Sequence, residues 1–175
     1  MKNGTSGTRA NENGKRGEEL TRNILTIHTG FQEMHHRDWI KEGRPAETLV
    51  QHAPYASIYG AGTKCRSEFL VSDSDGALVR IECKTQNVGG SVDEKLPYLF
   101  LNASQMWEEP IGLIVLHGNG FRECAVDWLR GVVDDFNRGR PSDGERRLYV
   151  QTIPEFMKFV EGHYQTPQQK RVRNQ

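Results

Sequence analysis

Two strand-like segments separated by a tight polar turn constrain the fold more than any other part of the sequence. The first, RSEFLVS, spans residues 66–72, and the second, ALVRIECKTQ, spans residues 77–86. Runs of this length that are rich in apolar and β-branched residues predict strands, and the intervening SDSDG is a favourable turn. The two segments are therefore expected to pair as an antiparallel hairpin.

The sequence before this hairpin predicts a helix, an irregular stretch and a strand. From residue 15 onward, apolar residues recur at helical spacing, namely Leu20, Ile24, Ile27 and Phe31. Gly30 supplies a stop for this helix. Residues 33–54 are polar and punctuated by Gly and Pro, so we expect an irregular segment with one short helical turn. Residues 55–59, YASIY, predict a strand.

The sequence after the hairpin alternates helices and strands. Residues 93–110 predict a helix over part of their length, with either an early start or a kink imposed by Pro97. The apolar run GLIVLH, residues 112–117, predicts a buried strand, and Asn119 with Gly120 predicts a turn. A helix over residues 125–136, a strand over 147–151 and a helix over 152–162 complete the order. Thr152 and Glu155 have the spacing of a capping box.

This order of elements mixes a hairpin with a crossover, which predicts an α/β fold with a mixed β-sheet flanked by helices. At 175 residues the chain is expected to form a single domain, over residues 14–162. Residues 1–13 are rich in Gly, Asn, Thr and Ser and predict a flexible N-terminal arm. Residues 163–175 predict a basic polar tail.

Composition argues against several classes of protein. The longest apolar run is far shorter than the ~20 residues that cross a bilayer, and no hydrophobic signal segment is present, so we expect a cytoplasmic protein without membrane contact. Lys plus Arg equals Asp plus Glu at 23 each, so no global positive charge indicates a nucleic-acid partner. Cys65, Cys83 and Cys124 lack a CxxC pair and are expected to be reduced core residues.

The strand over residues 77–86 carries the pattern that points to chemistry. Residues two apart in a strand share a face, so Glu82, Lys84 and Gln86 are expected to point one way. In the partner strand, Glu68 shares this face if the turn sets the right register. Because neighbouring strands lie ~5 Å apart, two carboxylates and an ammonium would then meet in a small volume.

Two carboxylates held this close repel each other unless a cation or a proton lies between them. Mg²⁺ suits two acidic ligands, because it fills its other positions with water and phosphate oxygens. Lys84 would then face a phosphate and orient the attacking water. The pattern thus predicts phosphodiester hydrolysis. By itself ExK is a short pattern that also fits a solvent-exposed strand face with a cross-strand ion pair.

In its order of elements and its ExK strand, the chain resembles the PD-(D/E)XK nuclease superfamily. That family has a restriction-endonuclease-like αβββαβ core, with an acidic residue in the second strand and (D/E)xK in the third. Glu68, Glu82 and Lys84 match these positions, and Gln86 fits the ExKxQ extension of some branches. The following VGGSVDEKLPYLFLN is similar to the stretch "GS/T…EK(I/L)PY" of restriction-type and phage-encoded relatives. A C-terminal α-β-α extension lies beyond this resemblance, which covers residues 15–117.

The resemblance implies a Mg²⁺-dependent DNA endonuclease, with Mn²⁺ able to substitute. It implies Glu68 and Glu82 as metal ligands, with Lys84 as the catalytic lysine and Gln86 in support. Relatives often add a first-helix glutamate, for which Glu18 is preferred over Glu19 because it flanks the apolar stripe. Double-stranded DNA is the expected partner, and a homodimer would place one site on each strand.

One position departs from the family pattern, because relatives usually have Asp, often after Pro, where this chain has Ser67 and Glu68. Asp73 and Asp75 are rival acids, but SDSDG fits a turn better than a strand. Two alternatives therefore stay open. One is a nucleic-acid-binding or assembly module that keeps the fold without cutting, and the other is a structure-specific nuclease such as a junction resolvase.

Overall fold

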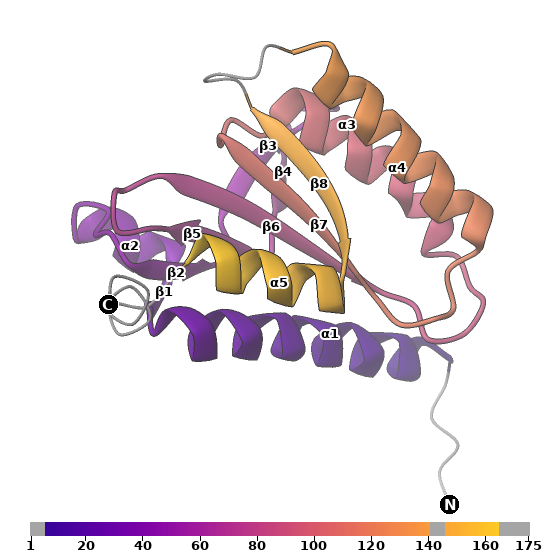
Figure 1. The fold of residues 1–175 in the computed structure, drawn as a ribbon, viewed down its shortest axis with the longest axis horizontal. Coiled ribbons are helices and arrows are strands. Elements are labelled where there is room, and N and C mark those ends of the chain that lie inside the picture. Colours follow the sequence, from indigo (N-terminus) through magenta and orange to yellow (C-terminus); the bar gives the residue numbers. More distant parts are fainter. Residues whose placement is uncertain (1–5, 141–145, 165–175) are drawn as a thin grey trace, which may run out of the picture.

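A six-stranded mixed sheet forms the centre of the computed structural model, which describes residues 6–140 and 146–164 (Figure 1). Its strands lie in the order β1-β2-β5-β6-β7-β8. Their bounds are β1 Gln32–His35, β2 Thr48–Gln51, β5 Phe69–Ser72, β6 Leu78–Thr85, β7 Ile111–His117 and β8 Arg147–Thr152. A separate two-stranded hairpin contains β3, Pro54–Ser57, and β4, Gly60–Arg66.

Strand directions follow from the connections between the strands. β5 and β6 are antiparallel because a short turn joins them, and β2 pairs antiparallel with β5 after the β3–β4 hairpin returns the chain. β6, β7 and β8 run parallel, and each step between them crosses over through a helix. The mixed sheet flanked by helices that the sequence predicts is confirmed, as is the β5–β6 hairpin.

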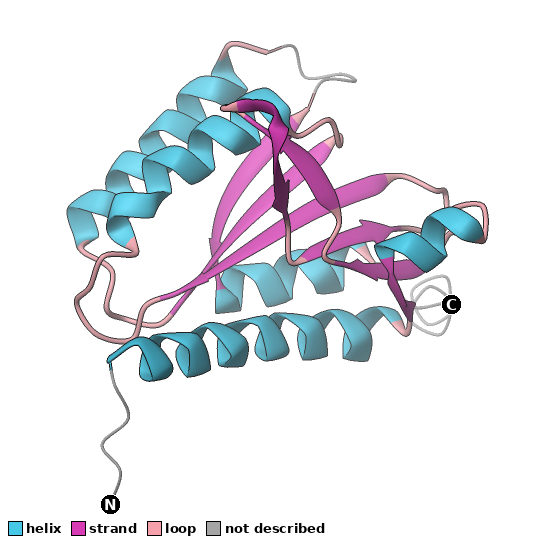
Figure 2. Ribbon diagram, turned by 180° about the vertical axis from the view of Figure 1, so that it is seen from behind, coloured by secondary structure: helices cyan, strands magenta, loops and turns pink. Residues whose placement is uncertain are grey.

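Helices cover both faces of the sheet (Figures 1 and 2). α1, Ser6–Thr29, and α5, Ile153–His163, pack on one face. α3, Leu96–Met106, and α4, Glu123–Arg138, pack on the other face together with the β3–β4 hairpin. α2, His36–Lys41, closes the end of the sheet near β1 and β2, and a short 3₁₀ turn, Asp93–Lys95, precedes α3.

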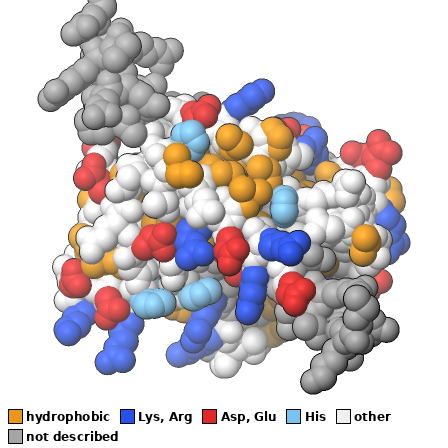
Figure 3. Space-filling view, turned by 90° about the horizontal axis from the view of Figure 1, so that it is seen from below, with side chains coloured by type: hydrophobic (Ala, Val, Ile, Leu, Met, Phe, Trp, Pro, Cys, Tyr) orange, Lys and Arg blue, Asp and Glu red, His pale blue; other side chains and the backbone are white. Residues whose placement is uncertain are grey.

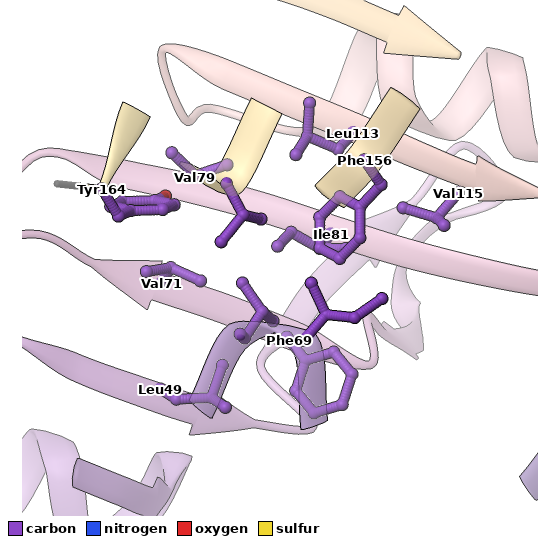
Figure 4. Packing of buried hydrophobic residues seen from close by; sticks show 12 residues of the cluster. Leu49, Phe69, Val71, Val79, Ile81, Leu113, Val115, Phe156 and Tyr164 are labelled. Carbon is purple, nitrogen blue, oxygen red and sulfur yellow. The ribbon is translucent and has the colours of Figure 1, made fainter. Parts of the chain in front are cut away.

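The main core lies between the sheet and the α1–α5 layer. Its strand residues alternate along β5 and β6, so that Phe69, Val71, Val79 and Ile81 all point into it (Figure 4). Phe156 of α5 is fully buried against them. This alternation places the odd-numbered residues of β6 in the core, which leaves Arg80, Glu82 and Lys84 on the opposite face.

Two local signals in the sequence are confirmed. Leu96 and Pro97 open α3, and proline is tolerated in the first turn of a helix because its missing N–H would have no partner there. In α5, the backbone N–H of Thr152 donates to Glu155 Oε2 at 2.7 Å, which completes the capping box.

The region before the hairpin differs from the sequence expectation. Residues 33–54 are not simply irregular with one helical turn, because they contain most of β1, the helix α2 and β2. The expected strand over residues 55–59 forms β3, which belongs to the separate hairpin, and β2 takes its place as the first antiparallel strand of the sheet. These strands are only four residues long, which is too short to show a clear alternation.

Helical and packed residues are found on both sides of the expected domain, residues 14–162. α1 begins at Ser6, inside the predicted flexible arm over residues 1–13, because extending an existing helix costs far less than nucleating one. At the other end, Tyr164 packs in the main core, beyond the predicted limit of 162. The remainder of the basic tail, 165–175, lies outside the described residues. Of the three cysteines only Cys83 is buried, whereas Cys124 is exposed.

In the described part of the chain, every helix is too short or too polar to serve as a membrane span.

Gly17 fixes how closely α1 approaches β6. A Cβ atom at this position would lie 1.9 Å from Thr85 Oγ1. Gly17→Ala is therefore expected to lower the free energy of unfolding by about 1–3 kcal/mol, because the added methyl group overpacks the helix against the strand. Gly14→Ala is the matched control, since nothing lies within 4 Å of its Cβ, and it should stabilise by up to ~1 kcal/mol. Urea unfolding of the two variants measures the difference, and equal stabilities would contradict the close approach.

Candidate active site

Three charged side chains meet where β5 begins, on the face of β6 that is opposite the main core. Phe69 pairs with Ile81 across the β5–β6 ladder, so Glu68, one residue earlier, lies opposite Glu82. Lys84 Nζ lies 2.5 Å from Glu82 Oε1 and 3.9 Å from Glu68 Oε1. The structure thus brings Glu68, Glu82 and Lys84 together, as the strand alternation implies.

The carboxylates of this cluster are only partly satisfied. The side chains of Glu68 and Glu82 are 16% and 7% exposed. Within the described chain, the Oε2 atoms of both are buried and have no hydrogen-bond partner. A buried carboxylate oxygen without a partner costs free energy, so these two atoms are available for a cation or a proton.

The pKa values show how the protein itself balances these charges. Burial, and next the neighbouring Glu82 carboxylate, raise the pKa of Glu68 well above its ordinary value. Burial acts against a charged Lys84, but the carboxylates of Glu82 and Glu68 outweigh it and raise the pKa of the lysine. Without metal, the site therefore shifts Lys84 toward its charged form and Glu68 toward its protonated form.

A buried ion pair below the cluster holds the backbone that carries Glu68. Arg80, two residues before Glu82 on the same face, donates to Glu109 Oε1 and Oε2 at 2.6 and 2.7 Å. The same guanidinium donates to Ala53 O at 3.0 Å and to Ser67 Oγ at 2.8 Å. Since Ser67 precedes Glu68, Arg80 fixes the approach of the first acidic residue to β6.

Gln86 lies just beyond the end of β6, and its side chain is bonded to the neighbouring loops. Its Nε2 donates to Asp93 Oδ1 at 3.1 Å and to Gly120 O at 2.8 Å, and its Oε1 accepts from the N–H of Val92 at 2.9 Å. In the described residues no hydrogen bond joins Gln86 to Glu82 or Lys84. Its direct influence is therefore on the two loops that end β6 and β7.

A pocket of about 160 Å³ opens beside Glu68, between α1 and the ends of β2 and β5. It is lined by Lys15, Glu18, Glu19, Arg22, Gln51, His52, Glu68 and Phe69. After burial and Glu82, the charge of Glu18 also contributes to the raised pKa of Glu68. Glu18 is partly buried and Glu19 is exposed, so the pocket wall brings Glu18 toward the cluster.

The groups present fit a divalent cation with oxygen ligands. Two buried carboxylate oxygens lack partners, and Mg²⁺ typically takes one or two protein carboxylates and keeps several waters. Within the described residues, no group of three or more His, Cys, Asp or Glu side chains is arranged to hold a metal ion. The site therefore matches a cation that shares its coordination with water and substrate rather than an all-protein cage.

The comparisons with known proteins agree with this geometry. A family model described as the PD-(D/E)XK nuclease superfamily domain matches residues 9–164. The chain belongs to the PD-(D/E)XK nuclease superfamily. Searches of curated proteins and of solved structures gave no match. Membership in the PD-(D/E)XK superfamily makes the chain a nuclease domain with a nucleic acid as its class of substrate, and such nucleases generally use divalent metal ions.

Several groups around this PD-(D/E)XK site escaped the sequence reasoning. Arg80 lies two residues before Glu82, so the two-residue alternation of the strand places it on the same face as Glu82 and Lys84. The sequence could therefore have identified it as a neighbour of the site. Its partner Glu109 is distant in sequence and shows no local signal. The basic residues Lys15 and Arg22 of the pocket lie about one helical turn before and after Glu18 on α1, but helical spacing alone does not show that they face the site.

Surface charge near the site is mixed. Figure 3 views the molecule from the side of α1 and α5, and acidic and basic side chains alternate across that face. This agrees with the equal numbers of acidic and basic residues in the chain. Attraction of a nucleic-acid phosphate must therefore come from local groups such as Lys15 and Arg22 rather than from an overall positive field.

Glu68→Gln is expected to stabilise the protein in EDTA at mildly alkaline pH. The folded wild type keeps a proton on Glu68 that the unfolded chain has released, so its stability falls as pH rises from about 4.5 toward the raised pKa. Glutamine does not titrate, and the gain should be on the order of 1 kcal/mol, since one pKa unit corresponds to ~1.4 kcal/mol. Urea unfolding at alkaline and acid pH measures this.

The control for this prediction is Asp75→Asn, which removes an exposed carboxylate on the β5–β6 turn and should change stability by less than ~0.5 kcal/mol. The difference between wild type and Glu68→Gln should vanish below the ordinary pKa of a carboxyl group. A Glu68→Gln variant that is less stable than wild type at alkaline pH would show that the carboxylates are not in conflict.

Proposed function

We propose that the chain is a Mg²⁺-dependent DNA endonuclease that hydrolyses phosphodiester bonds, with Mn²⁺ able to replace Mg²⁺. The observation that carries the proposal is the pair of buried, unpartnered carboxylate oxygens on Glu68 and Glu82 beside the Lys84 ammonium. Two acids and a lysine in this arrangement can hold a metal-bound phosphate and a water at one place.

Each residue of the cluster has a distinct role. A divalent cation held by Glu68 and Glu82 would lower the pKa of a bound water and offset negative charge on the phosphate. The raised pKa of Lys84 keeps its ammonium charged, so it can orient the attacking water and stabilise the charge that develops on the phosphate oxygens. Glu68 must release its proton before both of its oxygens can bind a cation, so binding should weaken in acid.

Two further residues support the cluster. Gln86 ties the end of β6 to Val92, Asp93 and Gly120, so it holds the loops beside Lys84 rather than the cation itself. Glu18 of α1 lies in the same pocket as Glu68 and is the helix carboxylate whose charge acts on it. We assign Glu18 as the additional helix acid of the site.

Cleavage of double-stranded DNA at a specific sequence, as in restriction, homing or phage-encoded enzymes, is the reaction we propose. A homodimer would place one site on each strand, because a two-fold axis matches the symmetry of the duplex backbone. Light scattering with and without duplex DNA tests the dimer. A particle with the mass of one chain under both conditions would refute it.

A structure-specific nuclease, such as one acting on junctions, is the second candidate. The observation that favours it is Tyr59, whose side chain is 74% exposed on the β3–β4 hairpin. An exposed aromatic ring can stack on an unpaired base, whereas the bases of an intact duplex are already stacked.

Cleavage of a mixed plasmid and phage DNA substrate tests the proposed activity. Wild type should cut in Mg²⁺ and in Mn²⁺ but not in EDTA, and Lys84→Ala should lower the rate by at least about a hundred-fold, because a charge-stabilising donor is lost. Glu82→Gln should lower it further by weakening cation binding. Lys158→Gln removes an exposed lysine from α5 and should cut as the wild type does.

The same assay separates the two helix acids. Glu18→Gln should slow cutting more than Glu19→Gln, its matched neighbour on α1. Discrete products would indicate a sequence-specific enzyme, and preferential cutting of junction DNA would favour the second candidate. Cutting that persists unchanged in Lys84→Ala would refute the assigned site, and a protein that binds DNA but never cuts it would be a binding module of the same fold.

A further inference from the structure

The β3–β4 hairpin has one face turned toward the protein and one turned to solvent. Tyr55 and Cys65 pair across it and face inward. Tyr55 packs against Trp107 with ring centroids 6.0 Å apart, and its ring lies 5.3 Å from the Arg80 guanidinium carbon. The hairpin thus stands on the sheet face that carries Glu82 and Lys84 (Figure 2).

The outward face of the hairpin carries two unshielded cations. Pro54 pairs with Arg66 and Ala56 pairs with Lys64, and all four residues are exposed. Residues two apart on β4 share this face, so Lys64 and Arg66 point the same way. Residues 54–66 contain no acidic residue, although acidic and basic residues are equal in number over the whole chain. The cations therefore have no carboxylate on the hairpin to neutralise them.

The tip of the hairpin is fixed to α3 by buried polar groups. The N–H of Ile58 donates to Asn102 Oδ1 at 3.1 Å, and the N–H of Tyr59 donates to Ser57 Oγ at 3.2 Å. Ser57 Oγ lies at hydrogen-bonding distance, 2.8 Å, from the Tyr98 hydroxyl. Ser57 and Asn102 are fully buried, so the backbone on both sides of Ile58 is held in place.

Tyr59 is presented on this fixed tip with one face of its ring open. Its ring stacks on Tyr98 with centroids 5.2 Å apart and planes inclined by 18°, yet its side chain remains 74% exposed. Stacking on Tyr98 covers one face and limits rotation of the ring. A rigid aromatic ring with a free face is the kind of platform on which bases of single-stranded nucleic acid stack.

We propose that the outer face of the β3–β4 hairpin binds the substrate strand, with Tyr59 stacking on an unpaired base and Lys64 and Arg66 contacting phosphates. This inference rests on the proposed nuclease function and deepens its second candidate, the structure-specific nuclease, by naming the substrate class: DNA with unpaired bases near the cut. Arg66 is two residues before Glu68, so its Cα lies within ~7 Å of that of the first catalytic acid. A strand bound along the hairpin therefore leads directly to the site.

Chain length limits how far the stacked base lies from the scissile phosphate. The nine residues from Tyr59 to Glu68 span at most about 30 Å, which corresponds to about nine nucleotides at ~3.4 Å each. A duplex could place a base on Tyr59 only by opening locally within this distance. Flaps, junction arms and single strands present such a base without that cost, which is why they are the preferred class.

Binding measurements with the Lys84→Ala variant as parent, in EDTA so that no cleavage takes place, test the inference. The probes are a single-stranded oligonucleotide that carries 2-aminopurine at successive positions and the matching duplex. Tyr59→Ala should weaken binding of the single strand about ten-fold and abolish the quenching of 2-aminopurine fluorescence, whereas Tyr59→Phe should preserve both because it keeps the ring. Binding of the duplex should change less.

Salt dependence tests the two cations separately. Lys64→Gln and Arg66→Gln should each reduce the slope of log K against log salt by about 0.7 for the single strand, because each removes one phosphate contact. Tyr59→Ala should leave that slope unchanged. Lys158→Gln, on α5 in the opposite layer, should change neither the affinity nor the slope. A variant set whose affinities, slopes and quenching all equal those of the parent would refute the hairpin as a contact surface.

The outcome for the hairpin is distinguishable from that for the active site. If wild type cuts DNA with metal and Tyr59→Ala neither weakens binding nor reduces quenching, the hairpin inference fails and the proposed function stands. If the parent binds neither probe and wild type does not cut, both fail. If Tyr59→Ala weakens binding while wild type cuts no DNA at all, the surface is confirmed and the cleavage proposal fails.

Discussion

The arrangement of this molecule depends on neutralising charges on one face of its central strand. β6 presents Arg80, Glu82 and Lys84 on the same side, where a folded core would ordinarily exclude them. Arg80 is neutralised by Glu109 at 2.6 Å, and Lys84 by Glu82 at 2.5 Å. Glu68 is the remaining carboxylate, and burial and the Glu82 charge raise its pKa by more than Lys84, 3.9 Å away, lowers it.

The Glu68 carboxylate is what makes this face of the sheet a candidate metal site. The Arg80 guanidinium holds Ser67 Oγ and Ala53 O, and the N–H of His52 donates to Glu68 O at 3.0 Å, so the backbone at Glu68 cannot easily move the acid away. Without metal, burial and the neighbouring Glu82 carboxylate raise the pKa of Glu68 at this place. Burial and the repulsion between the two carboxylates favour the protonated form of Glu68, and a divalent cation held between them would relieve the same repulsion.

The sequence predicted an element correctly where its periodic pattern repeats over enough residues. β6 has eight residues with a clear period of two, and its faces could be assigned before the fold was known. The same holds for the capping box of α5, which depends only on residues three apart. β1 and β2 were missed because strands of four residues contain too few alternations. β4 was missed because Gly60 and Gly62 interrupt its pattern with residues that have no side chain to alternate.

The helices α1, α3, α4 and α5, the β5–β6 hairpin and the ExK strand were determined by the sequence itself, because each depends on residues that are neighbours along the chain. The sequence also nominated Glu68, Glu82 and Lys84, since a cross-strand register follows from a turn. Only the tertiary structure decided that Arg80 pairs with Glu109, that Gln86 bonds to loops, and that the β3–β4 hairpin stands over the site. Those contacts join residues far apart in sequence, and only packing of the complete sheet and its helices brings them together.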